Sequence, residues 1–148
     1  MKLEKLLSIK PYEVINETSN SIFIQCWNCK KPEIFNLGFI TKENIFKQAQ
    51  QTYDYAVKEA MADLARFNKM ELETIVSYIE GYNCTLHQFA KLVKRTEKTL
   101  IFQKFEYQGM SCIAKPRDLI NDFIRVPAHK ISSYTEYNPE KTYYNNED

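Results

Sequence analysis

The sequence predicts a mainly α-helical protein with a small N-terminal β-hairpin, a long scaffold helix and a trihelical core. Apolar side chains recur every three or four residues over much of the chain after residue 42, which is the spacing of one buried helical face. The 148 residues include only three glycines and five prolines, fewer turn residues than a many-stranded sheet needs. With 44% hydrophobic residues, the chain can bury the core of an ordinary domain.

The N-terminal segment, residues 1–41, contains the predicted hairpin. Residues 21–25 are rich in large and β-branched apolar side chains, which favour a strand, and residues 33–40 form a second extended run. Cys26 and Cys29 lie between the two runs, followed by Lys-Lys-Pro. We therefore expect a hairpin with the cysteines at its turn.

The most regular segment covers residues 42–68, which contain neither glycine nor proline. Thr41 is placed to cap the helix, and Glu43 in the first turn is favoured by the helix dipole. The expected buried face consists of Phe46, Ala49, Tyr53, Ala56, Ala60, Leu64 and Phe67. This pattern predicts a long amphipathic helix that serves as a scaffold or a dimer surface.

Shorter helices are expected in residues 69–126. Their ranges are 70–82, 85–93, 96–108 and 116–126. Gly81 and Gly109 are placed as C-terminal stops, and Pro116 suits a first helical turn. Residues 127–148 are acidic and tyrosine-rich without a sustained period, so we expect an irregular tail that docks through its rings.

The segment 69–110 carries the features of a helix-turn-helix. Such a unit needs a small residue in its middle helix, a polar cap on the third helix and apolar anchors behind both. Ala90 supplies the small residue and Thr96 the cap. The anchors are Phe89, Val93 and Leu100.

The string TLHQFAKLVKRTEKTL at residues 85–100, followed by Lys104 and by Gly-Met at 109–110, resembles the Myb/SANT-like helix-turn-helix of phage and bacterial DNA-binding proteins. The resemblance covers about residues 69–110 and implies a trihelical fold whose third helix enters the DNA major groove. Two features depart from the family pattern: Gly109 lies one residue late, and the third helix is unusually apolar.

The charge distribution agrees with a nucleic-acid partner. Residues 85–130 hold nine basic and four acidic side chains, a net charge of +5 that the chain total of +1 conceals. A local basic block attracts phosphates within a Debye length of ~8–10 Å, and Arg95 beside Thr96 would meet a phosphate at a helix N-terminus. The predicted nucleic-acid-binding residues are Lys91, Lys94, Arg95, Thr96, Lys98, Gln103 and Lys104.

The cysteines suggest a zinc site. Cys26 and Cys29 have the spacing with which two thiolates grip one tetrahedral metal ion. Cys84 and His87 have the same spacing, and on a helix both side chains would fall on one face. Together the four residues would form a Cys₃His zinc site that clamps the hairpin onto the helical unit, with Cys112 as a competing ligand. The alternative is four buried or half-buried thiols in a reducing compartment.

Catalysis is not expected. The chain has two histidines, neither of which has a carboxylate or nucleophile nearby in a recognisable motif, and three glycines are too few for a phosphate-binding loop. No apolar run approaches the ~20 residues of a membrane span, and the N-terminus has no signal-peptide pattern. We expect a cytoplasmic protein in the interior of a host cell or associated with a virion, without a membrane partner.

Two functions follow from these features. The first is a nucleic-acid-binding accessory or regulatory protein of a phage or mobile element, which binds double-stranded DNA or another nucleic acid through the helix-turn-helix. The second is a protein-interaction component, a virion part or an inhibitor of a host machine, that reuses the helical unit without binding DNA. The apolar third helix and the acidic tail favour the second function.

Overall fold

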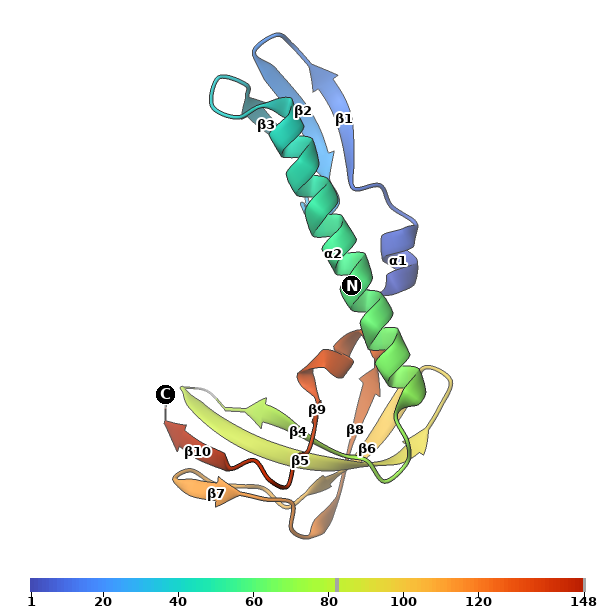
Figure 1. The fold of residues 1–148 in the computed structure, drawn as a ribbon, viewed down its shortest axis with the longest axis vertical. Helices are drawn as coiled ribbons and strands as arrows, with labels where there is room; N and C mark the ends of the chain where they lie inside the picture. The colour runs from blue at the N-terminus through green and yellow to red at the C-terminus, as the bar shows by residue number, and fades with distance from the viewer. Residues whose placement is uncertain (82, 148) are drawn as a thin grey trace. The chain divides into compact units, whose positions relative to one another are not determined.

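The structure, a computed structural model, describes residues 1–81 and 83–147 (Figure 1). Within this part the chain is mainly β, with ten strands and one long helix, so the predicted mainly helical fold class is wrong. The chain divides into two compact units, Met1–Ala62 and Asp63–Asp148. Residues 82 and 148, which end the predicted helix 70–82 and the predicted tail, lie outside the described residues.

The first unit combines a short helix, a three-stranded sheet and the first part of a long helix. Its elements are α1 (Leu3–Leu7), β1 (Tyr12–Glu17), β2 (Ser21–Cys26), β3 (Glu33–Asn36) and α2 (Lys42–Lys69), which continues into the second unit. The strands pair antiparallel in the order β1-β2-β3. The predicted hairpin is confirmed as β2–β3, and β1 adds a strand that the sequence did not predict.

Helix α2 begins and ends within one residue of the predicted helix. The Thr41 hydroxyl accepts a hydrogen bond from the Asn44 backbone N–H at 3.2 Å, as expected of an N-cap. Ala49, Ala60 and Phe67 are buried, whereas Leu64 of the predicted buried face is 39% exposed.

The core of the first unit lies between α2 and one face of the sheet (Figure 1). Ile22 and Ile24 of β2 pack with Ile45 of α2, and all three are buried. Tyr12 and Phe46 stack at this core with ring centroids 4.6 Å apart. A single helix covers a single face, so the other face of the sheet stays uncovered by this core.

The second unit is built on a seven-stranded antiparallel sheet. Its strands are β4 (Ile75–Glu80), β5 (Cys84–Arg95), β6 (Thr99–Phe105), β7 (Cys112–Ala114), β8 (Leu119–Pro127), β9 (Thr135–Glu136) and β10 (Tyr143–Glu147). The predicted helices 70–82, 85–93, 96–108 and 116–126 are therefore wrong, and the helix-turn-helix of residues 69–110 is a meander of β4, β5 and β6 instead.

The twelve-residue strand β5 organises this sheet. The order is β7-β10-β5-β4-β9, and β6 pairs with both β5 and β8. Along one edge, the start of β5 pairs with β10 and its end pairs with β6, while β4 occupies the other edge. An extra residue near Val93 shifts the register between β5 and β6, as a β-bulge does.

Both faces of this sheet are buried, and this explains the wrong helix prediction. On one face Ala90 and Leu92 pack with Phe67 of α2 and with Ile131. Phe89, which points to the opposite face of the strand, packs with Phe105, Ala114 and Tyr143. A strand buried on both faces loses its alternation, so apolar residues at 86, 89, 90 and 93 reproduce a helical spacing.

The C-terminal segment is not irregular throughout. It forms a 3-10 segment, Ala128–Ser133, followed by β9 and β10. Tyr134 stacks on Phe102, and the Tyr137 and Tyr143 rings both pack edge-on against Phe89. Across residues 1–81 and 83–147, none of the helices combines the length and the apolar character that crossing a bilayer requires.

Candidate functional site

Arg95, the expected centre of a nucleic-acid site, is bound to the protein itself. It ends β5, and its guanidinium donates to the backbone carbonyl of Phe67 at 2.8 Å and to that of Met70. It also lies over the Phe67 ring, 5.4 Å from the centroid. The last carbonyls of a helix lack partners within the helix, so Arg95 caps the C-terminus of α2.

Four other predicted residues also make contacts within the chain. The Lys91 ammonium pairs with Glu73 at 3.0 Å, and that of Lys104 pairs with Asp122 at 3.3 Å. The Gln103 amide donates to the carbonyl of Ile120. The Thr96 hydroxyl accepts from the N–H of Thr99 at 3.0 Å, which closes the β5–β6 hairpin rather than capping a helix. Lys94 and Lys98 are exposed.

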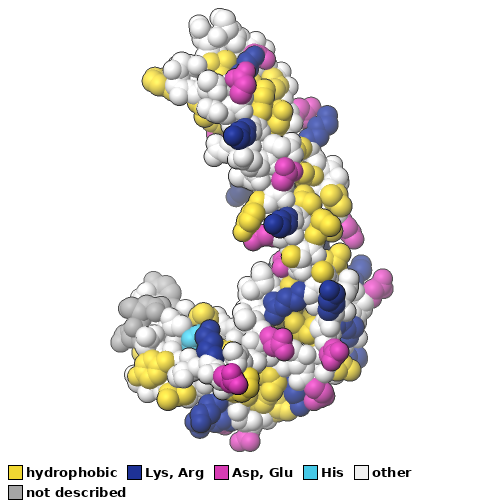
Figure 2. All heavy atoms as spheres, viewed as in Figure 1, with side chains coloured by type: hydrophobic (Ala, Val, Ile, Leu, Met, Phe, Trp, Pro, Cys, Tyr) yellow, Lys and Arg dark blue, Asp and Glu magenta, His cyan; other side chains and the backbone are white. Residues whose placement is uncertain are grey.

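Part of the predicted basic block is paired with acidic side chains. On the face drawn in Figure 2, lysine and arginine side chains lie interspersed with aspartate and glutamate. Lys91 of the basic block pairs with Glu73 outside it, and Lys104 pairs with Asp122, which is already counted in the block's net charge of +5. Nucleic-acid binding stays an untested prediction, and the helix-turn-helix on which it depended is absent from the described residues.

Zinc binding by Cys26, Cys29, Cys84 and His87 stays a prediction. Among residues 1–81 and 83–147, no three histidine, cysteine or acidic side chains lie together as metal ligands would. Cys84 and His87 lie on β5, where residues three apart point to opposite faces, so they lack the common face that a helix would have given them. Burial, followed by the nearby Cys29 and Glu33 charges, raises the pKa of the Cys26 thiol.

The outer face of the first unit's sheet, on the side away from α2, presents a row of apolar side chains. Phe23 of β2 is the Cα partner of Ile34 on β3 and of Asn16 on β1. Partners across strands share a face, and Phe23 lies between the buried Ile22 and Ile24, which point toward α2. Phe23 and Ile34 therefore point outward.

Ile15 of β1 completes this row. The register shifts between Val14 and Asn16, so Ile15 is the extra residue of a β-bulge and lies beside Asn16, opposite Phe23. We call Ile15, Phe23 and Ile34 the apolar row, which has one member on each strand. Ile34 is 73% exposed and Ile15 is 51% exposed, so two of its members are open to solvent.

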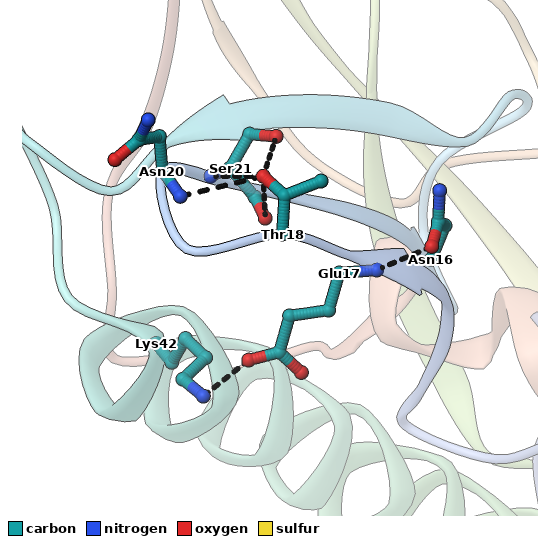
Figure 3. Close-up of polar contacts among 6 residues, drawn as sticks. All are labelled: Asn16, Glu17, Thr18, Asn20, Ser21 and Lys42. Atoms are coloured by element: carbon teal, nitrogen blue, oxygen red, sulfur yellow. Dashed lines mark hydrogen bonds and ion pairs between the residues drawn. The ribbon is translucent and has the colours of Figure 1, made fainter.

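The bulge is fixed by contacts on both sides of β1 (Figure 3). The Asn16 side-chain carbonyl accepts the backbone N–H of Glu17 at 2.9 Å. The Glu17 carboxylate points the other way and pairs with the Lys42 ammonium of α2, and this hydrogen bond and charge raise the pKa of Lys42. The pair is exposed and contributes little stability, but it marks the face of β1 that lies toward α2.

The β1–β2 turn is closed by side-chain hydroxyls. The Thr18 N–H donates to the Ser21 carbonyl at 2.9 Å, and the Thr18 hydroxyl accepts the Ser21 N–H at 3.1 Å. The same hydroxyl accepts the N–H of Asn20 at 3.3 Å (Figure 3). These bonds hold the register of β1 and β2, and with it the position of the apolar row.

Comparison with protein families, with curated proteins and with solved structures finds no match to this chain.

Polar and nearly uncharged residues surround the apolar row. Its neighbours on the outer face are Glu13, Asn16, Ser21, Gln25 and Asn36. Glu13 is the only charged side chain that the three strands place on this face. Phe39, in the turn after β3, is a further large apolar side chain and is 91% exposed. An uncharged apolar centre with a polar rim is the composition of a protein–protein interface.

Sequence reasoning did not find this surface, although the signal was present. Residues 21–25 and 33–40 were both predicted as extended, and each is apolar at successive positions. Such runs in a small sheet mean that both faces carry apolar side chains, while one long helix can cover only one face. Strand β1 was not predicted because its bulge interrupts the alternation of inward and outward side chains in residues 12–17.

Proposed function

We propose that this chain is a protein-interaction component that docks a partner protein through the outer face of its β1–β2–β3 sheet. The observation that carries the proposal is the apolar row, in which Ile15, Phe23 and Ile34 cross all three strands on the face opposite α2. Apolar patches on an open sheet face mark interaction sites, since leaving them in water is unfavourable.

The charge of this face favours a protein over a nucleic acid. Phosphate binding needs lysine or arginine, which supply most of the affinity of nucleic-acid complexes. The outer-face residues of β1, β2 and β3 include one acidic residue, Glu13, and no lysine or arginine. A partner protein with an apolar surface of its own fits this composition.

Site-specific photo-crosslinking in the cells that naturally make the chain tests the proposal. A photoreactive amino acid replaces Ile34, which is exposed enough for the change to leave the fold intact. The matched control replaces Ile79 on β4, an isoleucine that is also exposed, at 64%. We expect a discrete crosslinked product from position 34 that position 79 does not give.

A second substitution shows whether the product depends on the apolar row. Ile15→Lys, on another strand, is expected to reduce the yield from position 34 at least about tenfold, because a loss of ~1.4 kcal/mol corresponds to a factor of ten. Ile79→Lys is expected to leave the yield unchanged. Equal products from positions 34 and 79, or a yield that Ile15→Lys does not alter, would rule out docking through this face.

A further inference from the structure

The turn that leaves β2 brings two cysteines together. Cys26 is the last residue of β2, and the backbone N–H of Cys29 donates to the Cys26 carbonyl at 3.2 Å. A hydrogen bond between residues three apart closes a β-turn, whose ends lie within about 7 Å of each other between Cα atoms. A disulfide needs Cα atoms about 4.4–6.8 Å apart. The backbone of the turn is thus compatible with a bond between the two sulfurs.

The side chains influence each other. Burial, and after it the neighbouring Cys29 thiol, raises the pKa of the Cys26 thiol. Both cysteines are partly exposed, so a small molecule in solution can reach them. Both thiols of the turn are therefore open to reaction.

Neighbouring side chains hold this turn in place from two sides. The Gln25 amide donates to the carbonyls of both Cys26 and Cys29, at 2.9 and 2.7 Å. Trp27 donates from its ring N–H to the Thr52 hydroxyl of α2 at 3.0 Å, and its backbone N–H donates to Pro11. Since the turn is anchored in this way, its two ends stay close to each other.

We propose that Cys26 and Cys29 form a thiol–disulfide exchange site that takes low-molecular-weight disulfides of the glutathione type and closes to an intramolecular disulfide. The proposal rests on the turn and its thiols and is independent of the proposed docking function.

The exchange balances in two steps. The Cys29 thiolate attacks one sulfur of oxidised glutathione, the S–S bond breaks, and one glutathione leaves as thiolate and takes up a proton. Cys26 then loses its proton, attacks the Cys29 sulfur of the mixed disulfide and displaces the second glutathione as a thiolate, which takes up that proton. The two protein thiols are oxidised, and one glutathione disulfide is reduced to two thiols. Because Cys26 and Cys29 lie at the two ends of one β-turn, the second step is intramolecular.

The other two cysteines provide an internal comparison. Cys112 on β7 lies opposite Asn145 of β10, and Cys84 on β5 lies opposite residue 147 of the same strand. They occupy opposite sides of β10, two strand spacings apart and offset by two residues along it, so their Cα atoms are separated by more than ~9–10 Å. That separation exceeds the range of a disulfide, so the described structure offers the chain one ready cysteine pair.

Thiol counting on the full chain tests the proposal. The Cys84→Ser/Cys112→Ser double variant keeps the pair, and the Cys26→Ser/Cys29→Ser double variant removes it. On incubation with oxidised glutathione, we expect the first variant to lose both its thiols without gaining a glutathione adduct, and its mass to fall by two hydrogens. We expect the second variant to form no intramolecular disulfide.

Trp27, the only tryptophan of the chain, lies between the two cysteines and reports the same event. Its emission is expected to change on oxidation of the variant that keeps Cys26 and Cys29, and to stay constant in the variant that lacks them. If a substitution prevents folding, mapping the wild-type peptide that ends at Lys30 gives the linkage directly. A lasting glutathione adduct on Cys26 or Cys29, or two thiols that stay free while the chain is folded, would overturn the proposal.

Discussion

At the scale of single residues, Arg95 joins two parts of the second unit, strand β5 and the end of helix α2. It belongs to β5, and its guanidinium donates to two carbonyls at the end of α2. The guanidinium also makes a cation–π contact with the Phe67 ring. Cationic groups stabilise a helix C-terminus, where carbonyl oxygens carry partial negative charge. These contacts make Arg95 a stabilising residue of the fold.

Replacement of Arg95 by alanine should therefore lower the free energy of unfolding. We expect a loss of about 1 kcal/mol, because charge-assisted hydrogen bonds and a cation–π contact are lost and the site is partly solvated. The measurement is urea unfolding followed by circular dichroism. Lys94→Ala, at an exposed position one residue earlier, is the control and should change the stability little. Equal effects of the two substitutions would contradict the capping role.

His87 gives the second unit a dependence on pH. Burial, and to a smaller extent the charge of Lys141, lowers the pKa of His87 below its ordinary value of 6.5. The His87 ring packs edge-on against Tyr143. The unfolded chain therefore binds a proton at a higher pH than the folded chain. The contribution of neutral His87 to the free energy of unfolding is fully present above pH 6.5. It is lost as the pH falls from 6.5 through the lowered pKa of the folded chain.

We expect His87→Gln to remove this part of the acid sensitivity. The free energy of unfolding of the wild type should fall between pH 7.5 and pH 5 by more than that of the variant. His129→Gln is the matched control for the other histidine. Urea titrations at several pH values measure the difference, and parallel pH profiles for the wild type and His87→Gln would contradict the expectation.

At the scale of secondary structure, Gly81 is required between β4 and β5. Its φ of +127° lies in a region that other residues rarely adopt, and a Cβ there would approach the Cys84 Sγ to 2.6 Å and its carbonyl oxygen to 2.8 Å. Gly109, by contrast, has nothing within 4 Å of such a Cβ. Both glycines were predicted as helix stops, but only Gly81 is conformationally constrained.

Gly81→Ala should accordingly destabilise the chain by about 2 kcal/mol, from backbone strain and from the contact with Cys84. Gly109→Ala should leave the stability the same or slightly higher, because alanine has fewer conformations in the unfolded chain. Thermal unfolding of both variants checks this pair. A Gly81→Ala variant as stable as Gly109→Ala would show that the turn relaxes at no cost.

The elements of the first unit could be predicted from the sequence to a large extent, and those of the second could not. Helix α2 has one buried face and an N-cap, so its pattern is unambiguous. Strand β6 has Leu100 and Phe102 buried on one face and Ile101 and Phe105 on the other. Its apolar residues therefore do not alternate with polar ones as in a half-buried strand. Whether such a segment forms a strand or a helix is decided only by its pairing with strands that are distant in the sequence.

The capping signal at Thr96 was ambiguous for a local reason. A helix N-cap hydroxyl accepts an N–H two or three residues ahead, and the Thr96 hydroxyl accepts the N–H of Thr99 in a hairpin turn. Thr18 and Ser21 form the same arrangement in the β1–β2 turn. Threonine followed three residues later by serine or threonine thus closes two hairpins of this chain, and only the flanking pairing distinguishes that role from a cap.

At the scale of the whole molecule, the chain has separate cores in its two units. Ile22, Ile24 and Ile45 form the core of the first unit, while the second unit is held by clusters on both faces of its sheet. None of the described buried residues of one unit belongs to a cluster of the other. Units with cores of their own can unfold separately.

Two unfolding transitions are therefore expected. Trp27 lies in the first unit, so its fluorescence reports that unit alone, whereas far-ultraviolet circular dichroism reports both. Ile24→Ala, which removes a fully buried side chain, should destabilise the fluorescence-detected transition by about 2–5 kcal/mol. Leu92→Ala should shift the other transition by a similar amount and leave the Trp27 fluorescence transition unaffected.

Because α2 is continuous through residues 62 and 63, the alternative is that its unfolding couples the two cores. In that case both substitutions would shift a single transition that fluorescence and circular dichroism report together.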